Sequence, residues 1–343
     1  MSLHEPLLSI EALHVHIRTA AGIVQPVRGI DLQLEAGETL AIVGESGCGK
    51  SMTALAVMGL LPVGGSVAAG AVRLSGYRLD NLTESGWREV RGRRIGMVFQ
   101  NPMSAFNPTM RIGEQIAESL VHHRHLDWDH AHRRAVALLD RMRIPDAATR
   151  VQQYPFQFSG GMLQRAMIAM ALACGPELLI ADEPTTALDV SVQVGLLELL
   201  RELQTETGLA ILLITHDLAI VAEIAQRVAV MYAGQIVEQA PVDALFAQPA
   251  HPYTAGLLQS LPERHEGAGP LSAIAGTPPD LLQPPAGCAF YDRCPAALRL
   301  CATAAVPRVE ISATQRALCW LRHPAVVGSG AVPPLAEQQG SES

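Results

Sequence analysis

A short glycine-rich stretch near the N-terminus contains residues suited to binding phosphate. Residues 44–51 read GESGCGKS, which matches the pattern G-x-x-x-x-G-K-[ST] in full. Glycines let backbone N–H groups approach phosphate oxygens, the lysine can reach the terminal phosphates, and the serine hydroxyl can bind Mg²⁺. We therefore predict a phosphate-binding loop whose contacts come from Gly44, Glu45, Ser46, Gly47, Cys48, Gly49, Lys50, Ser51 and Met52.

Two carboxylates follow a later apolar run. Residues 178–181 read LLIA and lead directly into Asp182 and Glu183. A strand that ends in two acids can direct one carboxylate toward a metal ion, through water, and the other toward an attacking water molecule. We expect Asp182 to serve the metal and Glu183 to orient and deprotonate the water.

A second phosphate-binding element is predicted at residues 158–165, which read FSGGMLQR. Ser159 is suited to cap a helix, and Gly160 and Gly161 would expose backbone N–H groups at its start. This element lies 23 residues before Asp182. One terminal phosphate would then have two binding elements, which a single chain cannot easily fold onto each other.

The elements that must position these groups alternate between strand and helix. The pattern predicts strands at 13–17, 30–34, 39–43, 95–99, 178–181, 209–214 and 228–231. It predicts helices at 51–61, 112–123, 130–142, 162–173, 190–208 and 220–225. Such alternation indicates an α/β fold with a mostly parallel sheet covered on both faces, and residues 112–174 read as a helical insertion.

Composition excludes several classes of protein. The chain has 343 residues, 49% of them apolar, and a net charge of 25 − 33 = −8. It therefore lacks the basic excess of a sequence-independent nucleic-acid binder, so we expect no nucleic acid as main partner. Its longest apolar runs reach about half of the ~20 residues that cross a bilayer. Because the N-terminus also lacks signal-peptide features, we expect a cytosolic chain.

Taken together, these motifs resemble those of the ATP-binding subunits of ABC transporters. Gln100 is similar to the Q-loop glutamine of that family, residues 159–162 to its signature motif, and residues 187–189 to its D-loop, with Asp189. His216, between Thr215 and Asp217, is similar to its switch histidine. The resemblance covers about residues 8–260. It implies a P-loop, RecA-like α/β core with an antiparallel β part and a helical subdomain at about 102–175.

In that family two subunits pair head to tail, so that each ATP lies between the phosphate loop of one and the signature motif of the other. The resemblance thus implies that Glu183, His216 and Gln100 are catalytic and that Ser51, Gln100 and Asp182 serve Mg²⁺. Ser159, Gly160, Gly161 and Met162 would contact the ATP of the partner.

This sequence departs from the family at two places. No aromatic residue precedes Tyr77 to stack on adenine, which leaves His14, His16 or Ile17 as candidates. Met162 stands where many members have Gln.

The character of the chain changes near residue 262, where Pro and Gly become dense. We predict an ATPase domain at 1–261, an extension at 262–325 that needs some staple to hold it, and a loose tail at 326–343. Four cysteines fall within 32 residues, at Cys288, Cys294, Cys301 and Cys319. Their spacing is wider than that of zinc knuckles and leaves open an iron–sulfur cluster or no metal at all.

The extension has its own resemblance. The stretches HPYT at 251–254, GTPP at 276–279, GCAF at 287–290 and RCP at 293–295 are similar to the C-terminal extension of dipeptide and oligopeptide importer ATPases. Some members of that group hold a [4Fe–4S] cluster on four such cysteines. The resemblance therefore implies a cluster on Cys288, Cys294, Cys301 and Cys319.

The resemblance implies an ATPase subunit of a bacterial importer for di- or oligopeptides, on the cytoplasmic face of the inner membrane. Its partners would be two transmembrane permeases, a second ATPase (a paralogue or a second copy) and, indirectly, an external solute-binding protein. A permease coupling helix is expected near residues 100–108. The alternatives are import of nickel, a metallophore or another small solute and, from another class, a soluble ABC ATPase that acts on nucleic acid or ribosomes.

Overall fold

A computed structural model of the chain describes residues 5–186, 189–261 and 274–328. Its strands form two sheets, a four-stranded one in the order β2-β1-β4-β5 and an eight-stranded one in the order β11-β12-β10-β9-β3-β8-β7-β6. The strands are β1 (Leu8–Thr19), β2 (Gly22–Leu34), β3 (Thr39–Val43), β4 (Gly65–Leu74), β5 (Tyr77–Arg78), β6 (Ile95–Val98), β7 (Leu178–Asp182), β8 (Ala210–Thr215), β9 (Arg227–Tyr232), β10 (Gln235–Pro241), β11 (Arg308–Glu310) and β12 (Arg316–Leu318).

Helices lie on both faces of the eight-stranded sheet, and the four-stranded sheet packs against one of these faces. The α-helices are α1 (Lys50–Val57), α2 (Glu84–Val90), α3 (Pro102–Ala105), α4 (Ile112–Arg124), α5 (Trp128–Arg141), α6 (Ala147–Arg150), α7 (Gly160–Leu172), α8 (Val190–Thr207), α9 (Leu218–Ile224), α10 (Val242–Ala247), α11 (Pro252–Gln259) and α12 (Pro324–Val327). Short 3₁₀ helices lie at η1 (Pro155–Gln157), η3 (Tyr291–Arg293), η4 (Arg299–Ala302) and η5 (Trp320–Arg322). In the described part of the chain, no helix is both long and apolar enough to span a bilayer.

The parallel sheet predicted from the sequence is confirmed for β3, β6, β7, β8 and β9, which pair in parallel. Every residue of β3, β7 and β8 is buried. Strands covered on both faces read as continuous apolar runs, which is why their positions are legible in the sequence. The sheet is not parallel throughout, because β10, β11 and β12 add an antiparallel edge.

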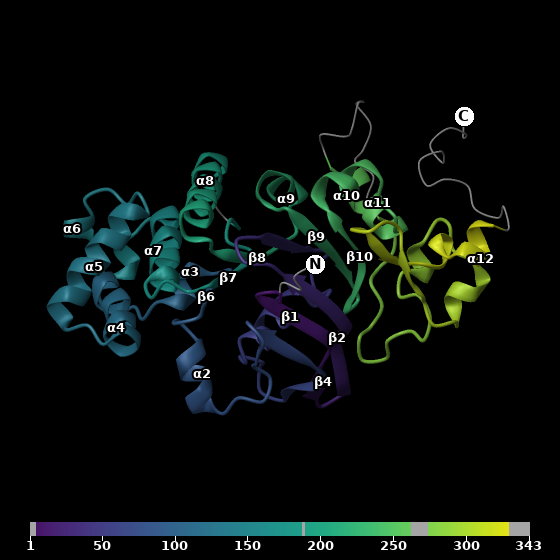
Figure 1. Cartoon of the computed structure of the whole chain (residues 1–343), viewed down its shortest axis with the longest axis horizontal. Coiled ribbons are helices and arrows are strands. Elements are labelled where there is room, and N and C mark those ends of the chain that lie inside the picture. The colour runs from purple at the N-terminus through teal and green to yellow at the C-terminus, as the bar shows by residue number, and fades with distance from the viewer. Residues whose placement is uncertain (1–4, 187–188, 262–273, 329–343) are drawn as a thin grey trace.

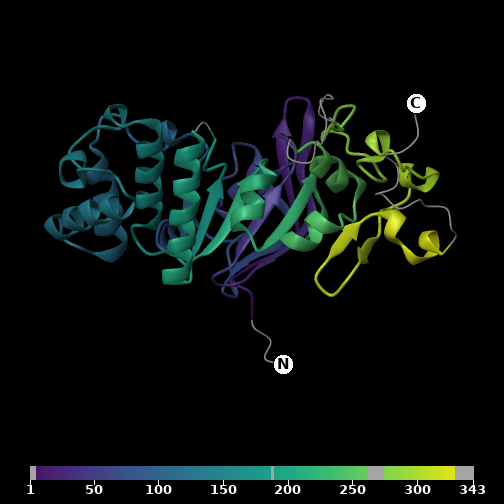
Figure 2. The same cartoon turned by 90° about the horizontal axis from the view of Figure 1, so that it is seen from above.

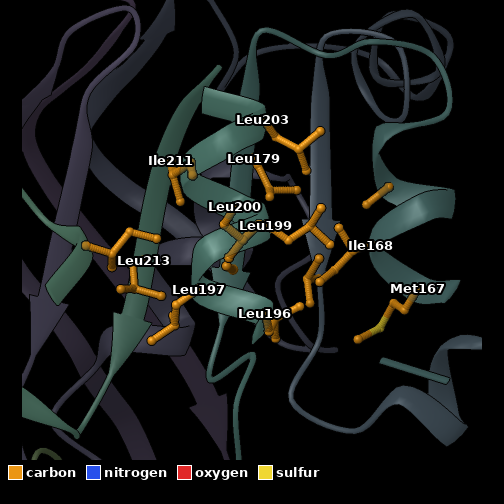
Figure 3. Close-up of a cluster of buried hydrophobic side chains, with 14 of the residues drawn as sticks. Met167, Ile168, Leu179, Leu196, Leu197, Leu199, Leu200, Leu203, Ile211 and Leu213 are labelled. Atoms are coloured by element: carbon orange, nitrogen blue, oxygen red, sulfur yellow. The ribbon is translucent and has the colours of Figure 1, made fainter. Parts of the chain in front are cut away.

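The core beside these strands is built around α8. Leucines of this helix lie between β7 and β8 on one side and α7 on the other (Figure 3). Leu196, Leu200 and Leu203 are almost completely buried, as are Leu179 and Ile168, which face them. This packing fixes α7 against the sheet and therefore places the start of α7 relative to the strand ends.

The helical part, α4 to α7, and the C-terminal extension lie at opposite ends of an elongated molecule (Figures 1 and 2). Helix α5 begins two residues earlier than predicted because Asp127 accepts a hydrogen bond from the His130 N–H and caps it. Helix α7 also begins two residues earlier than predicted, after the Ser159 cap. The predicted domain boundaries remain predictions, since residues 262–273 and 329–343 lie outside the described part.

The extension joins the cassette as an added strand. Strand β12 pairs with β10 through Glu238 opposite Ala317 and Gln239 opposite Arg316. Beside this pairing the buried Glu238 carboxylate accepts hydrogen bonds from the N–H groups of Ala250 and His251 and from the Gln315 side chain. Backbone pairing and a buried polar network thus help to attach the extension to the sheet, independently of any link that the four cysteines provide.

Candidate functional site

Four neighbouring strands deliver their following residues to one edge of the sheet. Val43 lies opposite Thr215, Asp182 opposite Ile214, and Val98 opposite Ala181. Because these strands are parallel, the phosphate loop after β3, Gln100 after β6, Glu183 after β7 and His216 after β8 all emerge at the same edge. The structure therefore brings together the predicted nucleotide and catalytic residues.

The phosphate loop is wrapped tightly around a buried ammonium group. Lys50 is 6% exposed, and its Nζ donates hydrogen bonds to the carbonyl oxygens of Gly44 at 2.7 Å and Glu45 at 2.9 Å. Gly49 has a φ of +111°, and a Cβ placed on it would lie 2.1 Å from the carbonyl oxygen of Pro26. The loop can hold this shape only because glycine tolerates the close backbone contact.

Of the three residues predicted to serve Mg²⁺, Ser51 and Asp182 are in direct contact, whereas Gln100 donates to Glu183. The Ser51 hydroxyl donates to Asp182 Oδ1 at 3.1 Å, and Asp182 is buried. Burial raises the pKa of Asp182, and the charge of Glu183 raises it further, against the effect of the Ser51 hydrogen bond. Oxygen donors of this kind suit Mg²⁺, whose positive charge would favour the ionised carboxylate.

Glu183 is the centre of a hydrogen-bond network. Its carboxylate accepts hydrogen bonds from Gln100 Nε2 at 2.8 Å, Thr186 Oγ1 at 3.0 Å and His216 Nδ1 at 3.1 Å. Partial burial would raise the pKa of Glu183, but the hydrogen bonds from His216 and Thr186 lower it below its usual value. A carboxylate kept ionised beside exposed Gln100 and His216 side chains is suited to accept a proton from water.

Thr186 is a third hydrogen-bond donor to Glu183 that none of the predicted motifs includes. Its hydroxyl lies one turn after Glu183, since the Thr186 N–H also donates to the Glu183 carbonyl oxygen. Glu183 itself has a φ of +49°, and its N–H donates to Ile214 on β8. The two threonines that follow Glu183 and Pro184 were the available signal for such a turn.

The predicted signature motif opens α7, as expected. Ser159 Oγ accepts a hydrogen bond from the Met162 N–H at 3.4 Å, and a Cβ on Gly160 would meet open space. A recess of about 480 Å³ lies here; it is lined by Arg143, Ser159, Gly160, Gly161, Met162, Arg165, Asp189 and Val192. None of these lining residues belongs to the phosphate loop.

Of the predicted D-loop, residues 187 and 188 lie outside the described part. Asp189 is exposed where α8 begins and lines the recess at the signature motif. The motif and the D-loop aspartate therefore share one surface, which the sequence analysis did not anticipate. Arg143 and Arg165 add two guanidinium groups to it, also unpredicted.

The three candidates for adenine stacking differ in how many contacts their side chains already make within the chain. The His14 ring packs against Gly29, where an added Cβ would lie 3.0 Å away, and its Nδ1 is hydrogen-bonded to Ala12 O. His16 and Ile17 are partly exposed. They remain predictions for the base contact.

The four cysteines of the extension are free thiols, and Cys301 and Cys319 are buried. The Cys288 N–H donates to the carbonyl oxygen of Cys301 at 2.7 Å. Burial raises the pKa of Cys319 to about 12, and the charges of Cys288, Cys294 and Cys301 act in the same direction. Among the described residues, no three His, Cys, Asp or Glu side chains are placed to hold a single metal ion.

The close backbone contact at Gly49 generates a prediction. Gly49→Ala should lower the affinity for Mg-ATP at least about tenfold, since it adds a Cβ at a strained φ against Pro26. Gly208→Ala is the matched control, because Gly208 also has a positive φ, +67°, and its added Cβ meets nothing within 4 Å. Titration of each purified variant with a fluorescent ATP analogue measures the difference. Equal affinities in the two variants would contradict the tight packing of the loop.

Two regions of the chain match known protein families. Residues 27–186 match the family described as ABC transporter, and residues 237–301 match the one described as oligopeptide/dipeptide transporter, C-terminal region. The dipeptide transport ATP-binding protein DppD of Bacillus subtilis is 47% identical over 319 residues, which cover 93% of this chain and 95% of that protein. The oligopeptide transport ATP-binding protein OppD of the same organism is 49% identical over 320 residues, covering 93% and 89%.

Solved structures agree with this assignment. The dimeric structure of MJ0796, a bacterial ABC transporter cassette, superposes with a TM-score of 0.62 at 25% identity, over 68% of this chain and 98% of that one. A post-hydrolysis dimer of the same cassette, bound to ADP and Pi, superposes at 0.63 and 24% identity, which supports the fold. Motifs, fold and relatives together show that the chain belongs to the ATP-binding proteins of ABC transporters, which are ATPases, and to their oligopeptide/dipeptide branch.

Proposed function

We propose that this chain hydrolyses ATP to drive a bacterial importer of di- or oligopeptides. The observation that carries the proposal is that one chain combines the phosphate loop and the Glu183 hydrogen-bond network with a region at 237–301 that matches the oligopeptide/dipeptide transporter C-terminal family. Relatives that align over 93% of the chain are described as dipeptide and oligopeptide transport proteins. Import of nickel or a metallophore, and action on nucleic acid or ribosomes, have no comparable support.

In the proposed site Lys50 binds the terminal phosphates, and the loop glycines present their N–H groups to them. Ser51, Asp182 and Gln100 would hold Mg²⁺, which supplies charge stabilisation for the transferred phosphoryl group. The Ser51–Asp182 hydrogen bond supports this assignment, because it places a hydroxyl and a carboxylate within 3.1 Å of each other.

Glu183 is the proposed general base. Its lowered pKa keeps the carboxylate ionised, so it can orient a water molecule and accept its proton during attack on the γ-phosphate. His216 and Gln100 hold the Glu183 carboxylate through one hydrogen bond to each of its oxygens. Both side chains are exposed at the sheet edge, where bound ATP would reach them.

The recess at Ser159–Met162 is proposed to bind the ATP of a second ATPase subunit. Its glycine N–H groups at the start of α7 and the Arg165 side chain suit an anion, whereas Arg143 at the same recess is already paired with Glu202. No residue of the phosphate loop lines the recess, which supports a second chain as the source of the phosphate. That chain would be a paralogue or a second copy.

The remaining partners are proposed to be two transmembrane permeases, with an external solute-binding protein that delivers the peptide. The chain would then lie on the cytoplasmic face of the inner membrane. Helix α3 directly follows Gln100 and is capped by Asn101, and Met103 on it is half exposed. This short helix is the proposed contact for a permease coupling helix.

We also propose that Cys288, Cys294, Cys301 and Cys319 hold a [4Fe–4S] cluster. Its support is that the backbones of Cys288 and Cys301 are in contact, through the hydrogen bond from the Cys288 N–H to the Cys301 carbonyl oxygen, and that all four cysteines are at least partly buried. A four-iron cluster is larger than one ion, so its thiolates stand further apart than those of a zinc site. The cluster would supply a structural link within a segment poor in regular structure.

The proposed base predicts the behaviour of one variant. Glu183→Gln should reduce ATP hydrolysis at least about 100-fold, because the amide cannot accept the proton. Binding of Mg-ATP should persist, and the ATP-bound dimer should accumulate. Phosphate release and size-exclusion chromatography with ATP measure both effects. Glu118→Ala, an exposed change on α4, is the control; hydrolysis by Glu183→Gln at the control rate would exclude this role.

The importer assignment predicts the composition of the native complex. Affinity purification from membranes in mild detergent should recover two permeases and a second ATPase with this chain. A solute-binding protein that is retained should release peptide when it is denatured, and mass spectrometry identifies that ligand. Release of a nickel complex would replace the peptide assignment, and recovery from the soluble fraction without permeases would favour the nucleic-acid or ribosome alternative.

The cluster proposal is tested by metal content. Protein purified without oxygen should contain about four irons and four sulfides per chain and absorb visible light. Cys319→Ser should lower the iron content, whereas Cys174→Ser, a change in a buried thiol outside the extension, should not. A folded, colourless and metal-free protein would show that the thiols are simply reduced.

A further inference from the structure

The phosphate loop carries a negative charge of its own. Glu45 directly follows Gly44, and its carbonyl oxygen accepts a hydrogen bond from Lys50 at 2.9 Å. An ionised carboxylate this close to the proposed phosphate site would repel ATP unless its charge were compensated. The loop therefore needs a cation that Lys50 cannot supply, because Lys50 is the group expected to bind the phosphates.

Arg293 of the extension supplies such a cation. Its Nη1 donates to Glu45 Oε2 at 2.7 Å and its Nη2 to Glu45 Oε1 at 2.9 Å. The Arg293 side chain is 5% exposed and that of Glu45 27%. A two-pronged pair in a partly buried setting is stronger and more directional than an exposed ion pair.

The Arg293 guanidinium group also makes several contacts besides the one to Glu45. It donates further hydrogen bonds to the carbonyl oxygens of Ala275 and Ile274 and to the Tyr232 hydroxyl. Its Cζ lies 5.7 Å from the ring centroid of Tyr232 and 5.8 Å from that of Phe290. Because Arg293 is fixed by these contacts, it can in turn fix the position of Glu45.

The backbone of Glu45 is fixed as well. Its N–H donates to the Tyr253 hydroxyl at 2.8 Å, and Tyr253 is fully buried. The Tyr253 ring packs against Tyr232 and Phe290, the two aromatic residues beside Arg293. The extension and the segment before it therefore hold one loop residue by its charge and by its backbone.

We propose that Arg293 is a positioning residue for ATP binding, which neutralises the Glu45 carboxylate and holds the phosphate loop through it. The proposal rests on the proposed function, namely that residues 44–51 bind ATP. It assigns the C-terminal extension a direct part in nucleotide affinity, beyond its part in folding. The alternative is that Arg293 only attaches the extension to the cassette.

The test is nucleotide affinity in the purified full chain, measured by calorimetry or fluorescence at low salt. Arg293→Ala should weaken Mg-ATP binding about tenfold and Mg-ADP binding less, because ATP carries more negative charge. Glu45→Gln in the Arg293→Ala background should recover most of the loss. Added salt should narrow the gap between Arg293→Ala and the unmodified chain.

Two further variants separate charge from folding. Arg293→Lys keeps the charge without the fork, so its affinity for Mg-ATP should lie between that of Arg293→Ala and that of the unmodified chain, because charge alone cannot restore the two-pronged contact with Glu45. Arg322→Ala is the matched control, because Arg322 attaches the extension through the carbonyl oxygens of Ala250 and Pro249 and does not pair with the loop. It should lower thermal stability and leave ATP affinity unchanged.

Each outcome has a distinct meaning. Lys50→Ala that binds ATP as well as the unmodified chain would overturn the proposed function itself. If Lys50→Ala does lose ATP binding but Arg293→Ala binds ATP as well as the unmodified chain, only the role of Arg293 is overturned. The role of Arg293 would also be overturned if Arg293→Ala lost the same affinity for ATP as for ADP and Glu45→Gln did not restore it. A loss of ATP affinity of the same size in Arg322→Ala would overturn it as well.

Discussion

The parallel register of β6, β7, β8 and β3 is the constraint on which the site depends. These strands pair directly with one another, so the residues that follow them meet at a single edge of the sheet. Gln100, Glu183 and His216 are far apart in the chain, yet each lies one or two residues beyond a strand end. A slip of one residue in any strand would turn the following side chain to the other face. The buried and mostly apolar strands therefore position the predicted site residues as well as the core.

Within that edge, two adjacent carboxylates are given different properties. Asp182 ends its strand in a buried position, and its pKa is raised. Glu183 turns out of the strand with a positive φ, which exposes it to three hydrogen-bond donors, and its pKa is lowered. Neighbouring acids with divergent pKa values are a common way to divide roles in catalysis. Here the different surroundings of the two carboxylates follow from a single backbone turn, which is held by the hydrogen bond from the Glu183 N–H to the Ile214 carbonyl oxygen.

Much of this was predictable from the sequence, for local reasons. The loop at 44–51, the acids after 178–181 and the cap at Ser159 are short patterns whose geometry comes from neighbouring residues. The catalytic roles proposed for Gln100 and His216 followed only from family resemblance. Thr186, Arg143 and Arg293 were not identified, because their roles depend on contacts that a linear pattern does not encode. The pairing of β10 with β12 was not predicted for a similar reason. It involves only two opposed residue pairs, which are too few to produce a recognisable strand pattern in the sequence.

The extension shows why such long-range contacts matter. Strand β12 continues the same sheet whose parallel strands carry the site, and Arg293 of the extension pairs with Glu45 in the phosphate loop. The loop is thus enclosed by elements from β2, β9, α11 and η3, contacted through Pro26, Met231, Tyr253 and Arg293. Three of these contacts involve backbone atoms of the loop, and the fourth involves its charge. A segment poor in regular structure can therefore influence the most constrained part of the cassette, because it contacts that part directly.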